Sequence, residues 1–368
     1  MAGPSALLVG PRGRRLCLEF AELLTRNSAA PASDAFLLAA SSAAYDLDPG
    51  RGISRVRGFA WGDGLQGPMP TSTPADVARL LDTIPLVDGD ERALLAALAA
   101  AVDGARYWQE PDGEDVLAAS PEVRGALARV AAVLTSSDLT TWWTTRLGST
   151  PQWSVTFDDP ASPAAPGAVS VAERLVRWRS QTAREEITAQ RERPSNPRAA
   201  WSGTWWSTPP AELTRTTRCL GVFGPIGLWL VEDRFGWERA TARPVAVPGD
   251  ASVYEIDGPE SWAWLCRRYP LEVTASRRHD WYRTTGVTAR WVIPDWSHVA
   301  NDIDAVHLTV AGYLTTAGRP LVVTDDAATV LAGWHPDATW WLTDIVPTSA
   351  IEQPWVRHDD GTWSEQPP

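Results

Sequence analysis

The chain has 368 residues, of which 44% are hydrophobic and 21% are charged, and its formal net charge is −12. This length exceeds that of a typical single-core domain, so two domains are expected. No apolar run approaches the ~20 residues that a membrane-spanning helix needs, so no membrane partner is expected. The acidic excess disfavours nucleic acid as a partner, because binding to a phosphate backbone requires a broad basic face.

The chain contains no lysine, and all 33 of its basic residues are arginine. A pyridoxal Schiff base, the usual P-loop and a protein kinase each require a lysine side chain, so these three mechanisms are excluded. GxSxG is also absent, which disfavours an α/β-hydrolase. GxGxxG occurs as GDGLQG at 62–67, but this stretch is rich in Gly and Pro and is expected to be loop or short strand, so it does not indicate a standard dinucleotide-binding unit. No other motif in the sequence indicates a particular cofactor.

Cys17, Cys219 and Cys266 are odd in number and far apart, which argues against a disulfide framework and against a clustered zinc site. The first fifteen residues place their positive charges after a short apolar stretch, which is the reverse of a secretory signal. These two observations predict a cytoplasmic protein.

Residues 1–157 are predicted to form a mostly helical domain. The sequence TPAD at 73–76 is typical of a helix start, with Thr73 as N-cap and Pro74 at the first helical position. Asp90 precedes a long apolar stripe in the same way, and Ser120 is expected to cap the helix that follows it.

Three prolines lie within residues 158–168, without any apolar period, and this composition predicts a linker. The second domain is therefore placed at 169–368, and it begins with an amphipathic helix that ends before Pro194. Beyond about residue 213 the pattern changes to short β-rich runs, interrupted by one helix near 259–269. Expected strands include GLWLVED, RPVAV, SVYEI, RWVIP, AVHLTVAGYL, PLVVT and TVLAGW. The fold class is thus α+β, with a helical N-terminal region and a C-terminal domain built on a mainly antiparallel or mixed sheet.

The chain has 21 tryptophans, and Thr-Trp-Trp occurs at 141–143, 204–206 and 339–341. In a strand, the two rings of such a pair lie on opposite faces of the sheet. One ring would then be core, and the other could stack on a flat ligand. The alternative is that the tryptophans close interfaces between layers of the fold.

All five histidines lie in the last ninety residues, so acid–base chemistry is expected in the C-terminal domain. His279 and His307 are the candidate catalytic residues, and His307 has several aspartates near it in sequence. No metal-binding spacing is present, so no metal ligands are predicted. A structural role for these histidines stays open.

The segment SRRHDWYRTTG, at 276–286, holds the candidate ligand-binding residues. Arg277, Arg278 and Arg283 could contact a phosphate or a carboxylate, and Trp281 could stack on a flat ring. The alternative is a polar loop whose arginines pair with some of the chain's 45 acidic residues.

The strings ARYWQEPDGEDVLAA, RRHDWYRTTG and DAVHLTVAGYL resemble those of a family of uncharacterised proteins from GC-rich bacteria, a resemblance that implies no particular activity. The order of SVYEI and LEVTASRR also resembles the ADP-ribosyltransferase fold, which would imply use of NAD. The chain departs from that pattern, because Glu255 stands where an Arg or His is wanted, Thr274-Ala275-Ser276 replaces Ser-Thr-Ser, and no E-x-E follows.

The sequence therefore predicts an enzyme or binding domain for a small anionic molecule, aromatic or nucleotide-like. The alternative is a non-catalytic protein whose tryptophans and arginines bind a protein partner. An ADP-ribosyltransferase-like, NAD-using enzyme is a minor alternative.

Overall fold

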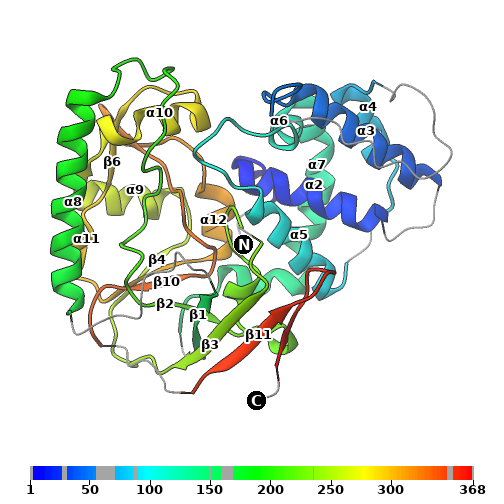
Figure 1. Cartoon of the computed structure of the whole chain (residues 1–368). Helices are drawn as coiled ribbons and strands as arrows, with labels where there is room; N and C mark the ends of the chain where they lie inside the picture. Colours follow the sequence, from blue (N-terminus) through cyan, green and yellow to red (C-terminus); the bar gives the residue numbers. More distant parts are fainter. Residues whose placement is uncertain are drawn as a thin grey trace. The chain divides into compact units, whose positions relative to one another are not determined.

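The computed structural model describes residues 3–26, 31–54, 71–86, 89–148, 151–158, 169–234, 236–345 and 351–366, with the backbone alone at 31–33 (Figure 1). The chain divides into two compact units. The first comprises residues 1–101 and 109–141, and the second comprises 102–108 and 142–368. The division therefore lies before the predicted linker at 158–168, of which all but Asp158 is outside the described residues.

The described part of the first unit is helical, as the sequence predicts. Its helices are α1 (Pro4–Leu7), α2 (Pro11–Arg26), α3 (Pro31–Leu47), α4 (Pro74–Leu81), α5 (Glu91–Asp103), α6 (Gly113–Ala119) and α7 (Pro121–Ser136), and the 3₁₀ helix η1 (Asp138–Thr144) follows. Thr73 and Asp76 form the expected capping box of α4. Ser120 does occupy the N-cap of α7, but its hydroxyl donates to the Leu117 carbonyl instead of capping the helix.

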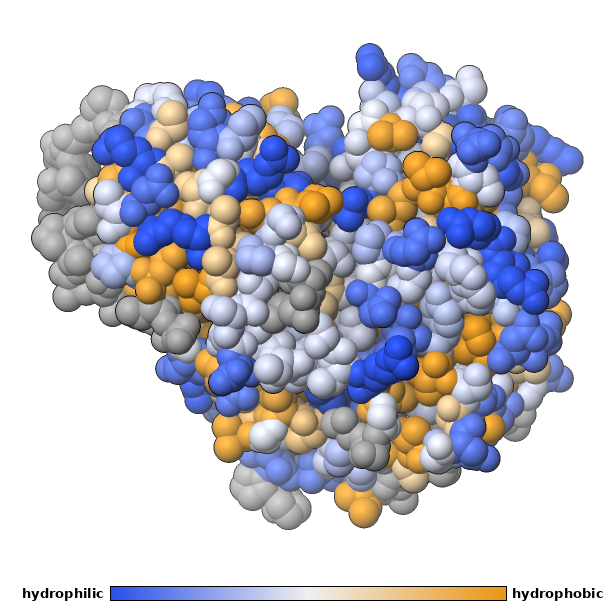
Figure 2. Space-filling view, turned by 180° about the vertical axis from the view of Figure 1, so that it is seen from behind, coloured by the Kyte–Doolittle hydropathy of each residue, from blue (hydrophilic) through white to orange (hydrophobic). Residues whose placement is uncertain are grey.

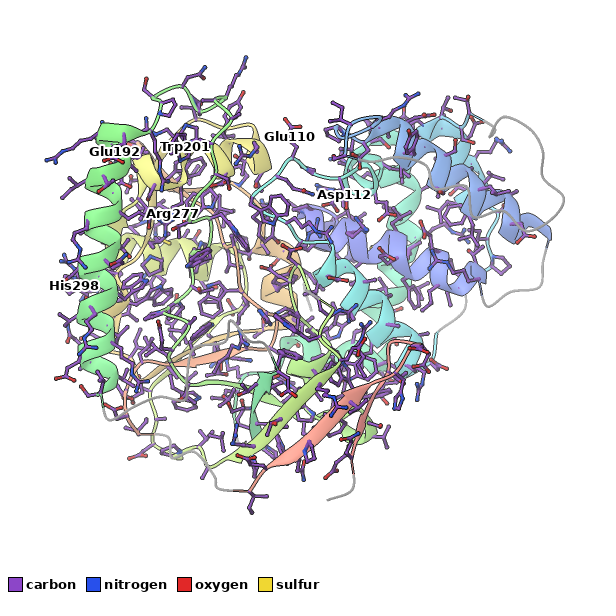
Figure 3. The ribbon with its side chains drawn as sticks, in the orientation of Figure 1. Glu110, Asp112, Glu192, Trp201, Arg277 and His298 are labelled. Atoms are coloured by element: carbon purple, nitrogen blue, oxygen red, sulfur yellow. The ribbon has the colours of Figure 1, made fainter. Side chains whose placement is uncertain are left out.

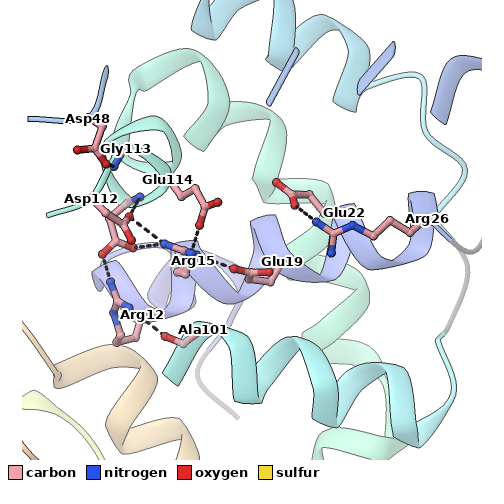
Figure 4. Close-up of polar contacts among 11 residues, drawn as sticks. Arg12, Arg15, Glu19, Glu22, Arg26, Asp48, Ala101, Asp112, Gly113 and Glu114 are labelled. Atoms are coloured by element: carbon pink, nitrogen blue, oxygen red, sulfur yellow. Dashed lines mark hydrogen bonds and ion pairs between the residues drawn. The ribbon is translucent and has the colours of Figure 1, made fainter. Parts of the chain in front are cut away.

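A buried ion-pair network joins α2 to the start of α6 (Figure 4). Arg12 pairs with Asp115 and donates to the Ala101 carbonyl at 2.9 Å. Arg15 contacts Asp112 at 2.9 Å. Burial acts to raise the pKa of Asp112, but Arg15 and the Asp115 backbone N–H outweigh it, and the net shift is downward. These acidic residues therefore hold α2 and α6 together.

The second unit contains strands in two mixed sheets. Among the described residues, the larger sheet has the order β12-β11-β3-β1-β2-β10-β7-β4 and the smaller has the order β5-β6-β9-β8. The strands are β1 (Gln152–Phe157), β2 (Arg215–Arg218), β3 (Arg239–Val245), β4 (Val253–Ile256), β5 (Pro270–Glu272), β6 (Arg290–Pro294), β7 (Ala305–Leu308), β8 (Leu321–Thr324), β9 (Ala327–Thr329), β10 (Thr339–Trp341), β11 (Gln353–Arg357) and β12 (Trp363–Glu365). β4 pairs with β7 in parallel and β6 with β9 in parallel, whereas the other pairs are antiparallel. The predicted α+β class is confirmed.

Helices of the second unit are α8 (Val171–Glu192), α9 (Pro259–Arg268), α10 (Thr274–Thr285), α11 (Trp296–Val299) and α12 (Val310–Thr316), with 3₁₀ turns η2 (Gly221–Phe223) and η3 (Ile226–Leu228). The long helix α8 packs against α10 and α11 (Figure 1). Ser170 caps its first turn by accepting from the Glu173 N–H at 3.3 Å. Among the described residues, no helix combines the length and the apolar character needed to cross a membrane.

Three expected strands are mostly or wholly absent. TVLAGW, at 329–334, has only Thr329 in a strand, at the end of β9. Residues 227–233 form the end of η3 and a turn, although Leu228 and Leu230 are buried. Residues 305–314 leave the sheet after Leu308, and α12 begins at Val310. A short apolar run is compatible with a buried strand or with a buried helical turn, so its hydrophobicity alone could not separate the two.

Tryptophans form much of the core of the second unit. The rings of Trp262, Trp296 and Trp334 lie 5.9–6.3 Å from one another, and all three are fully buried. Trp340 and Trp341, both on β10, are also buried. Edge-to-face and tilted packing of this kind accounts for most of these rings without a ligand.

Candidate functional site

Residues 274–285 form a helix, α10, and not the loop considered above. Glu186 of α8 accepts from the first backbone N–H groups, those of Ala275 at 2.6 Å and Ser276 at 2.9 Å. Gly286 ends the helix in the left-handed conformation, with φ of 70°. One side of α10 is therefore packed inward, and its polar residues are part of that packing.

The three arginines of α10 have internal partners. Arg277 is buried beside α8, where it contacts Ser276 Oγ at 2.8 Å and Glu185 at 3.5 Å (Figure 3). Burial lowers its pKa, and the charge of Glu185 opposes this shift. Arg283 pairs with Asp280 and donates to the Trp108 carbonyl at 3.0 Å, and Arg278 donates to Gln190 at 3.2 Å.

Trp281 and His279 are enclosed as well. Trp281 is fully buried, its indole N–H donates to the Trp205 carbonyl at 2.7 Å, and its ring packs edge-on against Trp291. No face of this ring is open for a ligand to stack on. His279 is also buried, and its pKa is lowered by burial and then by the charge of Arg278.

His307 lies on β7, in a buried charge network away from α10. Its Nδ1 is 2.5 Å from Glu255 on β4, and its Nε2 is 3.4 Å from Asp337. Arg218 of β2 pairs with Asp337 through its Nε and donates its backbone N–H to the same carboxylate at 3.0 Å. Although burial alone would lower the pKa of His307, Asp337 and Glu255 raise it to about 9.

The structure therefore does not gather the six predicted site residues into one site. Five lie on α10, where the arginines and Trp281 contact internal partners and His279 is buried. His307 lies on β7 and has both ring nitrogens beside carboxylates. The Arg283–Asp280 pair lies within α10. Glu185 of α8 reaches Arg277, and Glu255 of β4 and Asp337 reach His307, through tertiary contacts. These tertiary pairings could not be read from sequence neighbours.

A cavity of about 1020 Å³ lies elsewhere in the second unit. Its walls come from α8, from residues 205–212, from the start of β2, from residues 231–233, from Trp237 and from residues 333–340. This volume is at the upper end of the range found for small-molecule sites. Among its lining residues are five tryptophans and four arginines: Trp178, Trp205, Trp206, Trp237, Trp340, Arg174, Arg177, Arg184 and Arg215.

Arg215 is the most distinctive of these arginines. Its guanidinium lies over the ring of Trp340, 5.5 Å from the centroid, and its Nη1 lies 3.5 Å from His335 Nε2. Among the described residues, no carboxylate lies within ion-pair distance of it. Burial lowers its pKa to about 10, which still leaves the group charged at neutral pH.

His335 is held as a neutral imidazole. Burial and then the charge of Arg215 lower its pKa well below the usual value, although a hydrogen bond to the Leu230 carbonyl acts in the opposite direction. A neutral ring that donates to Leu230 presents its other nitrogen as an acceptor, which suits Nε2 facing Arg215. His335 therefore positions the guanidinium without neutralising it.

Backbone geometry fixes the tryptophans at one edge of the cavity. Ser207 N donates to the Ala332 carbonyl at 2.9 Å, and Ala332 N donates to Ser207 Oγ at 3.0 Å. Gly333, with φ of 80°, lies so close to this segment that an added Cβ would be 2.7 Å from Trp206 Cβ. Trp206 keeps 43% of its surface exposed, so part of its ring is free to contact a ligand.

The sequence analysis did not single out Arg215, His335 or the arginines of α8. One signal was available, because Arg174, Trp178, Gln181 and Arg184 recur at helical spacing on one face of α8. No comparable signal marks His335, whose role depends on a strand that lies 120 residues earlier in the chain.

Among the described residues, no group of three or more His, Cys, Asp or Glu side chains is arranged to hold a metal ion. No protein-family model matches the chain, and neither a curated protein nor a solved structure shows significant similarity to it. The cavity is therefore the basis on which a function can be proposed.

Proposed function

We propose that the second unit binds a small anionic molecule with an aromatic part, and that the binding site is the cavity beside Arg215. The observation that carries this proposal is the position of Arg215, a charged group in the cavity wall without a carboxylate partner among the described residues. A desolvated charge is costly unless it is paired. A carboxylate or phosphate of the ligand would supply the missing partner, and the planar guanidinium suits bidentate contact with either group.

The charged residues around the cavity support an anionic ligand. Four arginines line it against three acidic residues, Glu212, Glu232 and Asp233. Asp233 is already paired with Arg106 at 2.9 Å. The cavity is thus locally cationic in a chain whose net charge is −12, and a field of this sign would attract anions.

The tryptophans support an aromatic ligand. Trp178, Trp205 and Trp237 are half-buried at the cavity wall, and Trp206 is exposed there. Trp237 is stacked on Phe157, with 4.7 Å between the ring centroids, and is therefore held in place. Fixed indole rings bind flat ligands with little loss of side-chain entropy.

Calorimetric titration with two matched pairs of probes tests the proposal. The pairs are 2-naphthoate with uncharged 2-naphthol, and adenosine 5′-monophosphate with adenosine. The anionic member of at least one pair should bind about tenfold or more tightly, because a charge-assisted hydrogen bond contributes about 1.5–3 kcal/mol. Arg215→Met should abolish this preference for the anion.

Arg239→Met provides the control, since Arg239 is exposed on β3 and does not line the cavity. The control should keep the preference of the wild-type protein. If all four probes fail to bind at millimolar concentration, or if charged and uncharged members bind equally, the proposed function is wrong. Titration with NAD, with an assay for released nicotinamide, tests the ADP-ribosyltransferase-like alternative in the same experiment.

A protein-binding surface is the second candidate, favoured by two exposed tryptophans outside the cavity. Trp201 and Trp264 are each 41% exposed, and Trp264 is stacked on Tyr254. On the face shown in Figure 2, hydrophobic residues occur in small groups among polar ones. A partner retained by wild-type protein and by Arg215→Met, but lost with Trp201→Ser and Trp264→Ser together, would favour this candidate.

We also place the protein in the cytoplasm as part of this proposal. The three cysteines are free thiols, two of them buried, as is usual in a reducing compartment. Fractionation of cells that produce the protein would test the location.

A further inference from the structure

We infer that the ligand carries two separate anionic groups, one for Arg215 and a second for the arginines of α8. This inference rests on the proposed function and adds the class of ligand. The second group would lie along the cavity face of α8, where Arg177 and Arg184 are presented.

The geometry of α8 creates an extended cationic edge. Arg174, Arg177, Gln181 and Arg184 line the cavity and lie three or four residues apart, so they share one face of the helix. A rise of 1.5 Å per residue places Arg177 and Arg184 roughly 10 Å apart along the axis. Their side chains can converge on an anion near Gln181, whose side-chain oxygen already accepts from Arg184 at 3.2 Å.

Two acidic residues of α8 have partners other than Arg177 and Arg184. Glu186 binds the backbone at the start of α10, and Glu185 contacts Arg193 and Arg277. Among the described residues, the side chain of Arg177 has neither a hydrogen bond nor an ion pair, and the side chain of Arg184 has a polar contact with Gln181 alone. The helix thus presents Glu185 and Glu186 to α10, and it presents Arg177 and Arg184 to the cavity.

Arg215 and the α8 arginines belong to different walls. Arg215 projects from β2 and contacts Trp340 and His335, neither of which contacts α8 through a described polar interaction. Arg184 contacts Gln181, whereas Arg215 contacts His335, so these two arginines have different polar partners. A ligand with a single anion would therefore neutralise either Arg215 or the α8 arginines, but not both. A ligand with two separate anions could contact both sets of arginines.

An aromatic core with two anionic groups fits either a nucleoside bisphosphate or an aromatic dicarboxylate. The cavity, at about 1020 Å³, has room for both. The shared chemistry is a flat aromatic ring combined with two separate oxyanions. Two probes distinguish the sources: adenosine 3′,5′-bisphosphate represents the nucleotide, and naphthalene-2,6-dicarboxylate represents the dicarboxylate.

The test compares each probe with its single-anion counterpart, adenosine 5′-monophosphate or 2-naphthoate, by calorimetry. We expect the second anionic group to lower the Kd about tenfold or more in one of the two series. The series that shows this effect identifies the source. In the double variant Arg177→Gln with Arg184→Gln, the ratio of the two Kd values should fall to about one, while the single-anion probe binds as before.

Arg191→Gln is the matched control, because Arg191 is exposed on the same helix and does not line the cavity. It should keep the wild-type ratio of Kd values, and a loss there would indicate general attraction to α8 and overturn the inference. Equal binding of one-anion and two-anion probes to wild-type protein would also overturn it, while leaving the proposed function intact. Failure of the single-anion probes to bind would instead reject the proposed function itself.

Discussion

Arg215 and Arg218 lie three residues apart on β2 and have opposite electrostatic surroundings. Arg218 pairs with Asp337 and lies 5.5 Å from the ring centroid of Trp142, whereas Arg215 faces a neutral His335 and Trp340. Side chains separated by three positions on a strand point to opposite faces. One face of this short strand therefore carries an arginine that is paired within the protein. The other face carries an arginine that is available to bind an anionic ligand.

The first prediction compares Arg215→Met with Arg218→Met in the unliganded protein. Arg218→Met should lower the free energy of unfolding by about 3–5 kcal/mol, because it removes the guanidinium partner of the buried Asp337 carboxylate and leaves His307 as its remaining cation. Arg215→Met should leave the unfolding free energy unchanged within about 1 kcal/mol or raise it. Urea denaturation measures both values, and equal losses in the two variants would mean that Arg215 has an internal partner.

The second prediction concerns stability at alkaline pH. The pKa of His307 in the folded protein is about 9, above its ordinary value near 6.5. The stabilisation it gives is therefore fully present below pH 6.5 and is lost as the pH rises through about 9, by on the order of 3 kcal/mol in total. Urea denaturation between pH 6.5 and 9.5 measures the loss, and NMR titration of the imidazole assigns it. A His307 signal that titrates below pH 7 would contradict the network.

The third prediction concerns stability at acidic pH. His335 stays neutral in the folded protein, because burial and Arg215 lower its pKa, whereas the unfolded chain takes up a proton near pH 6.5. The unfolded state then binds more protons, so stability is kept above pH 6.5 and is lost below it, by about 2 kcal/mol at pH 5. His335→Gln should lose less stability than wild type between pH 7 and 5. Identical slopes for the two proteins would show that His335 is protonated in both states.

The fourth prediction uses Gly333. An alanine there would adopt an unfavourable positive φ and would place its Cβ against Trp206. We expect Gly333→Ala to lower the unfolding free energy by about 1–3 kcal/mol and to weaken probe binding by moving Trp206. Gly221→Ala is a useful comparison, because φ is also positive there but no atom lies within 4 Å of the added Cβ. Gly221→Ala should reduce stability without changing the Kd.

The sequence predicted helices well where a periodic apolar face coincided with a cap. Thr73 with α4 and Asp90 with α5 are examples, since both signals lie within a few residues of the helix they start. Strands were harder to predict. The three-residue strand β10 is recognised only through its neighbours β2 and β7, and these lie far from it in the sequence.

The candidate site was less predictable than the fold. A cluster such as Arg277, Arg278 and Arg283 shows that charge is present, but not which charges are already paired within the protein. Glu185 and Gln190, which answer that question, are about ninety residues away from α10 in the sequence. Arg215 could not be singled out from the sequence for a different reason. It is a candidate ligand-binding residue because it has no carboxylate partner among the described residues, and a sequence does not show which arginines lack such a partner.

The position of β1 determines how the protein could be divided. β1 precedes the predicted linker, yet it lies between β2 and β3 in the larger sheet, with Gln152 opposite both Arg218 and Val245. A fragment that starts at Val169 would therefore open two strand edges in the middle of the sheet, and such edges promote aggregation. A recombinant second unit should include β1, and a synthetic peptide of residues 151–158 could restore solubility to a fragment made without it.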